Sequence, residues 1–183
     1  MTLQKIISNK KYLFLDRDGV INKRIMDGYI KTWEEFEFLP GVLDALAIFS
    51  RFYDKVIIVT NQQGVGKNIM TEAELVNIHA ILKQEVEKHG GRIDAIYYCT
   101  DLRDKKNNCR KPGNSMFLKA QGQFPEIDPK LSIMIGDTSS DMKFAINSKM
   151  AGILIENENT TEEDKLHADA CTDQLITIAH LIK

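Results

Sequence analysis

The segment Tyr-Leu-Phe-Leu-Asp-Arg-Asp-Gly-Val-Ile-Asn at residues 12–22 decides how the chain is expected to fold. Its first four residues, Tyr12–Leu15, are all apolar, which is typical of a strand that is buried on both faces. Asp16 and Asp18 follow this strand directly, and Gly19 then favours a turn. Because open parallel α/β sheets bind ligands beyond the carboxyl ends of their strands, this junction is the first candidate site.

Four more short apolar runs repeat the pattern further along the chain, and amphipathic segments separate them. Strands are expected at residues 56–59, 93–98, 131–135 and 152–155. Helices are expected at residues 41–51, 71–88, 115–123, 139–148 and 173–182. Thr71 and Glu74 have the spacing of a capping box at the start of one helix. Strands that alternate with helices predict an α/β fold, with a parallel sheet covered by helices on both faces.

Length and charge limit the classes of protein that this chain can belong to. It has 183 residues, 24 basic and 26 acidic side chains, and a formal net charge of −2. This length fits a single domain over residues 1–183. The small negative charge disfavours nucleic-acid binding, which relies on a basic surface. The sequence has no apolar run of the ~20 residues that span a membrane, no signal peptide pattern and only three cysteines. We therefore expect a cytoplasmic protein without a membrane partner, and a monomer.

Polar residues follow each strand of the predicted sheet except the last, and they should meet at one edge. They are Asp16 and Asp18, Thr60, Asn61, Gln62 and Gln63, Arg110 and Lys111, and Asp137 and Asp141. Any one of these groups alone is more often part of a turn or a helix cap. Their occurrence in order, each group after a strand or the loop that follows it, favours a functional site instead.

These residue types suit phosphoryl transfer. Asp16 can attack phosphorus and form an aspartyl phosphate. Asp18, two residues further on, suits the general acid that protonates the leaving alkoxide and the base that then activates water. Lys111 and the Thr60 hydroxyl would hold the phosphoryl oxygens.

The same edge is expected to bind Mg²⁺. Two unit like charges at ~4 Å and an effective dielectric of ~20 repel by about 4 kcal/mol, so a carboxylate that approaches a phosphate needs screening. Asp16, Asp137 and a backbone carbonyl near Asp18 offer the all-oxygen ligation that fits magnesium. Asp141 is expected to support the site by orienting Lys111 or the waters of the metal.

The ordered motifs resemble those of the haloacid dehalogenase superfamily of phosphohydrolases. The resemblance is carried by Phe14-Leu-Asp16-Arg-Asp18, Val59-Thr60-Asn61, Lys111, and Ile135-Gly-Asp137 with Asp141. A fuller pattern over about residues 11–155 is similar to the D-glycero-D-manno-heptose 1,7-bisphosphate phosphatases and the histidinol-phosphate phosphatases. It adds Asp27-Gly28-Tyr29-Ile30, Phe36-Glu-Phe38, Tyr97-Tyr-Cys99 and Cys109-Arg-Lys-Pro112.

The resemblance implies a Rossmann-like core without a cap domain, and a magnesium-dependent phosphatase that works through an aspartyl phosphate. It gives Asp16 the role of nucleophile and Asp18 that of proton donor. It also implies that a small phosphorylated substrate is bound by Asp27, Gly28, Tyr29, Asn61, Gln62, Gln63 and Arg110. The favoured reaction is removal of the 7-phosphate of heptose 1,7-bisphosphate, and hydrolysis of histidinol phosphate is the alternative.

The chain departs from this family where many members bind a structural zinc, before the Arg-Lys-Pro motif. The Cys-x-His pair of the family reads Cys99-Thr-Asp101 here, and its Cys-x-Cys pair reads Asn107-Asn-Cys109. Two thiols and one carboxylate make a poor tetrahedral site, so no structural zinc is expected. We expect no disulfide between the two thiols either, since disulfides are rare in the cytosol.

Two loops are expected to select the substrate, because the length leaves no room for a cap domain. Residues 22–39 are too long for a tight turn and carry four aromatic side chains, so they should fold over the core. Residues 103–111 carry five basic side chains against one acid. His79, in the middle of a predicted helix, is expected to pack or to lie at the surface.

Three alternative functions fit the same fold less well. A polynucleotide 3′-phosphatase would need a basic groove, which the isoelectric point of about 6.1 disfavours. A non-catalytic protein would be expected to lack a motif residue, and all of them are present. In a hydrolytic dehalogenase, Asp18 and Asp137 would have no metal ion to bind. Within the phosphatases, Thr138 stands where many heptose bisphosphate phosphatases have lysine, which weakens the assignment to that subgroup.

Overall fold

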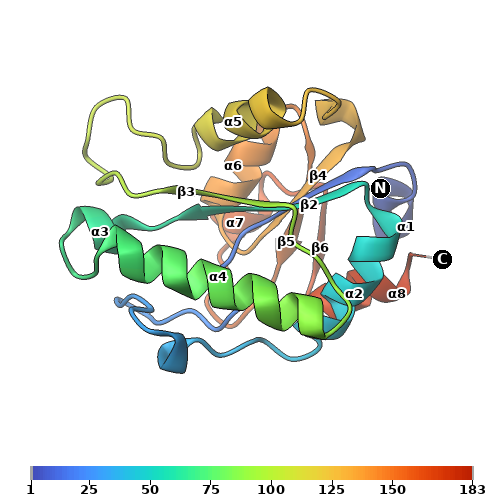
Figure 1. Ribbon diagram of the computed structural model, residues 1–183. Coiled ribbons are helices and arrows are strands. Elements are labelled where there is room, and N and C mark those ends of the chain that lie inside the picture. Colours follow the sequence, from blue (N-terminus) through green and yellow to red (C-terminus); the bar gives the residue numbers. More distant parts are fainter. Residues whose placement is uncertain (1, 183) are drawn as a thin grey trace.

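The computed structural model describes residues 2–182. Six strands form one sheet in the order β3-β2-β1-β4-β5-β6, and all of its strand pairs are parallel (Figure 1). The strands are β1 (Tyr12–Leu15), β2 (Lys55–Asn61), β3 (Ala95–Cys99), β4 (Ser132–Gly136), β5 (Ala151–Ile155) and β6 (Ala170–Thr172). The chain moves outward from β1 to β3 and then returns to the other side of β1, so the direction of strand order reverses between β1 and β4.

Helices cover both faces of the sheet, with α5 and α6 on one face and α2, α4 and α8 on the other (Figure 1). The helices are α1 (Leu3–Ile7), α2 (Val42–Phe52), α3 (Gln63–Gly66), α4 (Glu72–Lys88), α5 (Ser115–Gln123), α6 (Ser139–Asn147), α7 (Glu162–Lys165) and α8 (Leu175–His180). Two 3-10 turns are η1 (Trp33–Glu35) and η2 (Pro129–Leu131). None of the described helices has the length and apolar character that crossing a membrane requires.

The residues of β1 supply both hydrophobic cores in alternation. Leu13 and Leu15 pack into the cluster that includes the buried side chains of α2, α4 and α8. Phe14 packs into the opposite cluster, where its ring lies 5.5 Å from that of Phe117 on α5. Burial on both sides explains why the strand shows an uninterrupted apolar run rather than alternation. Each such side chain contributes about 1.5–3 kcal/mol when it is fully buried.

The five predicted strands and five predicted helices are present, and each end lies within two residues of its predicted position. The capping box of α4 forms as expected, with Thr71 accepting from the Glu74 backbone and Glu74 accepting in return. The sequence did not predict α1, α3, α7 or β6. These elements have five residues or fewer, which is too short for a clear periodic signal.

Residues 22–39 fold along the core and pack their own aromatic side chains. Trp33 stacks on Phe36 with ring centroids 4.8 Å apart, and Phe38 meets both rings edge-on. Within residues 2–182, this segment and residues 100–114 extend from the sheet as loops, and neither builds a cap domain. That residues 1–183 form a single domain stays a prediction.

Candidate active site

The ends of β1 and β4 bring the first two carboxylates together. The strands pair in parallel with Leu15 opposite Ile135, so Asp16 and Asp137 leave the sheet side by side. This is the point where strand order reverses, the usual ligand position in such sheets. Gly19 has a φ of +94°, and any side chain there would collide with the Asp137 carboxylate. Glycine is therefore required for the close approach of this turn to Asp137.

Lys111 ties two of the carboxylates together. Its Nζ lies 2.8 Å from Asp16 Oδ1 and 2.6 Å from Asp141 Oδ1, and it donates to the carbonyl of Val59 at 2.8 Å. Burial alone would lower the pKa of the Lys111 ammonium, but Asp141 and Asp16 outweigh it and raise that pKa. Lys111 therefore stays protonated and available to bind phosphoryl oxygens.

Burial has the opposite effect on the carboxylates themselves. It raises the pKa of Asp16, and the nearby charge of Asp141 raises it further, while Lys111 and Arg24 oppose this. It also raises the pKa of Asp137 well above the usual range, although Arg24 partly offsets the effect. The site thus concentrates negative charge that needs cations to be stable at neutral pH.

Asp18 is held differently from Asp16. Nη2 of Arg17 donates to both carboxylate oxygens of Asp18, at 2.8 and 2.9 Å. The side-chain amides of Asn22 and Gln62 also donate to this carboxylate, at 2.9 and 2.8 Å. Burial on its own raises the pKa of Asp18, but these donors together lower it below the ordinary value. The Asp18 side chain is therefore an oriented carboxylate.

His79 on α4 supports Arg17 from behind, a contact that the sequence did not predict. Its Nε2 lies 3.1 Å from Arg17 Nη1, and because arginine can only donate, this nitrogen accepts. Burial, with the charge of Arg17, lowers the pKa of His79 to about 3. His79 is therefore not a surface residue: it packs in the interior, as one of the two predicted alternatives had it, and accepts as a neutral imidazole from Arg17.

Two residues predicted to bind substrate also connect other parts of the site. Asn61 pairs with the Lys111 backbone, donating to its carbonyl at 3.2 Å and accepting from its amide at 3.0 Å. Gln62 donates to Asp18 and, at 2.9 Å, to the Thr60 hydroxyl. These bonds hold the loop after β2 and the loop before α5 in one arrangement.

All of the predicted substrate-binding residues line one cavity of about 750 Å³. They are Asp27, Gly28, Tyr29, Asn61, Gln62, Gln63 and Arg110. Asp16, Asp18, Thr60 and Lys111 line the same cavity, whereas Asp137 and Asp141 are buried outside its lining. The structure therefore brings the predicted residues together around a space of the size that small ligands fill.

The cavity also includes residues to which the sequence analysis gave no role in the site. They are Arg17, Arg24, Ile25, Met26, Ile30, Lys67, Arg103, Thr138, Ser139, Ser140 and Asp164. Arg24 and Arg103 lie in the two loops that were expected to select the substrate. Their position in the sequence could therefore have marked them as candidates for the cavity lining. Asp164 accepts from the Ser139 backbone at 2.6 Å, and no motif marks this contact between α7 and α6.

Three oxygens in the site come from the residues predicted to hold a divalent cation. They are Asp16 Oδ2, Asp137 Oδ1 and the backbone carbonyl of Asp18, and a single nitrogen of Arg24 contacts all three. An all-oxygen set of this kind fits magnesium. Asp141 also lies close, but its oxygens are engaged by Lys111 and by the Thr138 backbone and hydroxyl, as a supporting residue requires.

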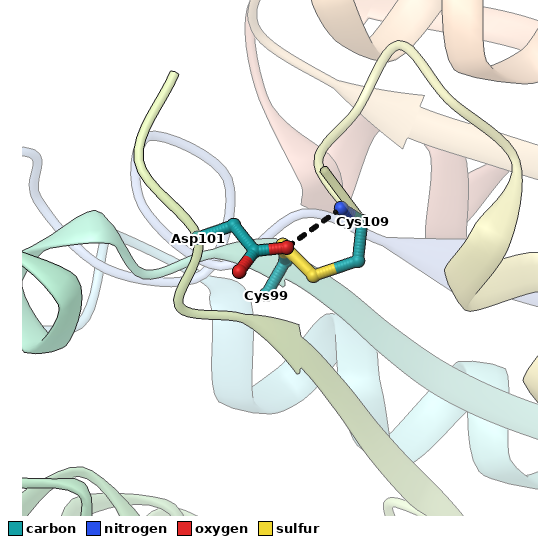
Figure 2. A group of neighbouring side chains, drawn as sticks. All are labelled: Cys99, Asp101 and Cys109. Carbon is teal, nitrogen blue, oxygen red and sulfur yellow. Dashed lines mark hydrogen bonds between the residues drawn. A yellow bond between two sulfur atoms is a disulfide. The ribbon is translucent and has the colours of Figure 1, made fainter. Parts of the chain in front are cut away.

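A disulfide joins Cys99 and Cys109, contrary to our expectation (Figure 2). The loop turns back because the Cys109 amide donates to Asp101 Oδ2 at 3.0 Å, which brings the two Cα atoms within 5.6 Å. The expectation rested on the compartment alone, because disulfides are rare in the cytosol. The absence of a structural zinc stays a prediction.

Comparison with known proteins places the chain in a class. A family model described as HAD-hydrolase-like matches residues 108–179. The D-glycero-alpha-D-manno-heptose-1,7-bisphosphate 7-phosphatase of Mycobacterium tuberculosis is 39% identical over 135 residues, covering 74% of this chain and 71% of that protein. The D-glycero-beta-D-manno-heptose-1,7-bisphosphate 7-phosphatase of Haemophilus influenzae is 31% identical, covering 94% of this chain and 97% of that protein.

A solved structure agrees with these relatives. The D,D-heptose 1.7-bisphosphate phosphatase from B. bronchiseptica, complexed with magnesium and phosphate, has a TM-score of 0.83 and 27% identity, covering 93% of this chain and 96% of that one. The fold is that of a HAD-like hydrolase. Within that class, the chain belongs to the family of heptose-1,7-bisphosphate 7-phosphatases. The predicted fold class and the predicted resemblance are confirmed.

Proposed function

We propose that this protein is a magnesium-dependent phosphatase that removes the 7-phosphate of D-glycero-D-manno-heptose 1,7-bisphosphate. The observation that carries the proposal is a cavity lined by Asp16 and Lys111, in which the Lys111 ammonium lies 2.8 Å from Asp16 and 2.6 Å from the buried Asp141 behind the lining. The relatives named above support the choice of substrate, since both carry the name of this activity.

Asp16 is the proposed nucleophile. Its Oδ1 accepts from the Arg17 amide at 2.7 Å and contacts Lys111, so the carboxylate has a fixed direction. Attack on phosphorus forms the aspartyl phosphate and breaks the bond to the sugar oxygen. Lys111 and the Thr60 hydroxyl then hold the phosphoryl oxygens, whose charge grows in the transition state.

Asp18 is the proposed proton donor to the sugar oxygen. Its donors keep its pKa low in the structure, so it is ionised at neutral pH until substrate enters. An approaching phosphate raises the pKa of this carboxyl by like-charge repulsion, which lets it take up the proton that it gives to the leaving group. After that transfer it is again a base and can activate water to hydrolyse the aspartyl phosphate.

Asp16, Asp137 and the Asp18 carbonyl would hold Mg²⁺, which supplies charge screening between the nucleophile and the phosphate when it is bound. The second phosphate of the substrate requires cations at the other side of the cavity. Lys67, Arg103 and Arg110 line the cavity and could supply these cations, and Arg110 donates to the carbonyl of Asp101 at 3.3 Å. A cavity of about 750 Å³ suits a sugar bisphosphate.

A turnover screen tests this proposal. Purified protein with Mg²⁺ is offered both anomers of heptose 1,7-bisphosphate, histidinol phosphate and a 3′-phosphorylated oligonucleotide, and phosphate release is measured. We expect the highest kcat/KM for a heptose bisphosphate, and the Asp16→Asn variant controls for contaminating phosphatases. A higher kcat/KM for histidinol phosphate would overturn the assignment of heptose bisphosphate and make histidinol phosphate the substrate. A cytoplasmic location, a monomeric state and the lack of nucleic-acid and membrane partners stay predictions.

A further inference from the structure

Arg24 contacts the same three oxygens that the proposed function assigns to magnesium. Its Nη2 lies 2.7 Å from Asp137 Oδ1, 2.8 Å from the Asp18 carbonyl and 3.9 Å from Asp16 Oδ2. Among the residues that the structure describes, Asp137 makes its ion pair with Arg24 alone. The guanidinium is thus the counter-ion of a carboxylate that strongly needs one.

The guanidinium reaches these oxygens from the cavity rather than from the core. The Arg24 side chain is 38% exposed, whereas those of Asp137 and Asp16 are 3% and 9% exposed. The backbone before it is fixed, since the Lys23 amide donates to the Glu37 carbonyl at 2.8 Å. Rotation of the Arg24 side chain alone would therefore move its charge from the three oxygens into the cavity, which it already lines.

A guanidinium and a divalent cation cannot share this position. Both are positive, and unit like charges at ~4 Å repel by about 4 kcal/mol even at an effective dielectric of ~20. Metal binding at the three oxygens must therefore release Arg24. A released guanidinium has a planar fork of donors that matches the geometry of a phosphate, the group that would enter the same cavity.

We propose that Arg24 is an exchangeable counter-ion: it competes with Mg²⁺ for Asp137 and Asp16, and once displaced it binds the phosphate of the substrate. This inference rests on the magnesium site of the proposed function. The exchange makes Arg24 a substrate-binding residue that is available only after the metal has bound. The order in which Mg²⁺ and the substrate bind would then be set by the charge of the Arg24 side chain.

Calorimetric titration of Mg²⁺ without substrate tests the competition. We expect Arg24→Ala to bind Mg²⁺ about tenfold more tightly than wild type, within the range of typical coupling between two ligands. Lys23→Ala is the matched control, because it removes the same charge from the neighbouring residue, whose side chain pairs with Glu37. We expect its Kd to stay within about twofold of wild type.

Equal Mg²⁺ affinity in wild type and Arg24→Ala would overturn the inference and leave the proposed function intact. A shift of the same size in Lys23→Ala would also overturn it, since the effect would then be long-range charge. Absence of Mg²⁺ binding by wild type would overturn the metal assignment and this inference together. Arg24→Gln, which keeps the side-chain length, is measured beside Arg24→Ala so that a folding defect in one variant is recognised.

Binding of inorganic phosphate to the Mg²⁺-saturated protein tests the second half of the exchange. We expect phosphate to bind Arg24→Ala about tenfold more weakly than wild type or Lys23→Ala, because a charge-assisted donor is missing. The opposite signs of the two effects, tighter metal and weaker phosphate, distinguish exchange from simple damage to the site. Phosphate affinity equal to wild type would overturn the transfer of Arg24 to the phosphate.

Discussion

The two sides of the cavity are built in different ways. The strand side consists of Asp16 and Lys111 in the lining and of Asp137 and Asp141 behind it, all buried and placed by the ends of β1, β4 and neighbouring segments. The loop side consists of residues 24–29 and 103–110, which are mostly exposed or half-buried and are held by single hydrogen bonds and one disulfide. A parallel sheet can fix the positions of charged groups to within a fraction of an ångström, whereas loops can change their conformation around a ligand. We expect chemistry to depend on the strand side and substrate choice on the loop side.

The largest effect should come from the strand side. Asp16→Asn removes the proposed nucleophile, so kcat should fall by at least about 10⁴-fold, as when the nucleophile of a hydrolase is deleted. The variant should keep the wild-type circular dichroism spectrum, because asparagine fills the same space. Phosphate release from heptose bisphosphate measures this. Activity near wild type would overturn the nucleophile assignment.

Removing Lys111 tests whether the strand side depends on charge balance. Lys111→Ala leaves Asp16 and Asp141 facing each other without their shared cation, which should cost about 3–5 kcal/mol of unfolding free energy. Urea unfolding measures it, with the exposed Lys119→Ala as the control for loss of a surface lysine. If both variants lost the same small amount of stability, the bridge would not hold the strand side together.

Removing the disulfide tests the loop side. Cys99→Ser opens a loop with a sequence separation of ten residues, which should cost about 2–3 kcal/mol in the chain-entropy model. KM should rise more than kcat falls, because Cys109 directly precedes Arg110. Cys171→Ser is the matched control, since Cys171 is an exposed free thiol. A larger fall in kcat than rise in KM would contradict the division of labour between the two sides.

His79 tests how far support for the strand side extends into α4. The folded pKa of His79, about 3, lies below its unfolded value of 6.5, so its neutral form stabilises the fold above pH 6.5 and this contribution is lost as pH falls toward 3. Wild type should therefore lose about 2 kcal/mol more than His79→Gln between pH 7 and pH 5. Urea unfolding at the two pH values measures the difference. Parallel pH dependence in the two proteins would show that His79 is not buried as a neutral acceptor.

Much of the strand side could be predicted because its signals are local. An apolar run such as Tyr12–Leu15 predicts a buried strand, and the residue after it then lies at the carboxyl edge of the sheet. The sequence therefore predicted that Asp16, Thr60, Lys111 and Asp137 would meet, and the structure brings them to one site. The three-residue β6 escaped prediction because it is too short to carry a periodic pattern.

By itself, the sequence determined the order of strands and helices, the cluster of charged residues at one sheet edge and the family, because each depends on neighbours along the chain. Only the tertiary structure decided that Arg24 contacts the three oxygens proposed to bind magnesium, that His79 accepts from Arg17, and that Cys109 lies against Cys99. These partners are separated by 6 to 113 residues. Their contacts depend on side-chain directions and loop paths that no local pattern encodes.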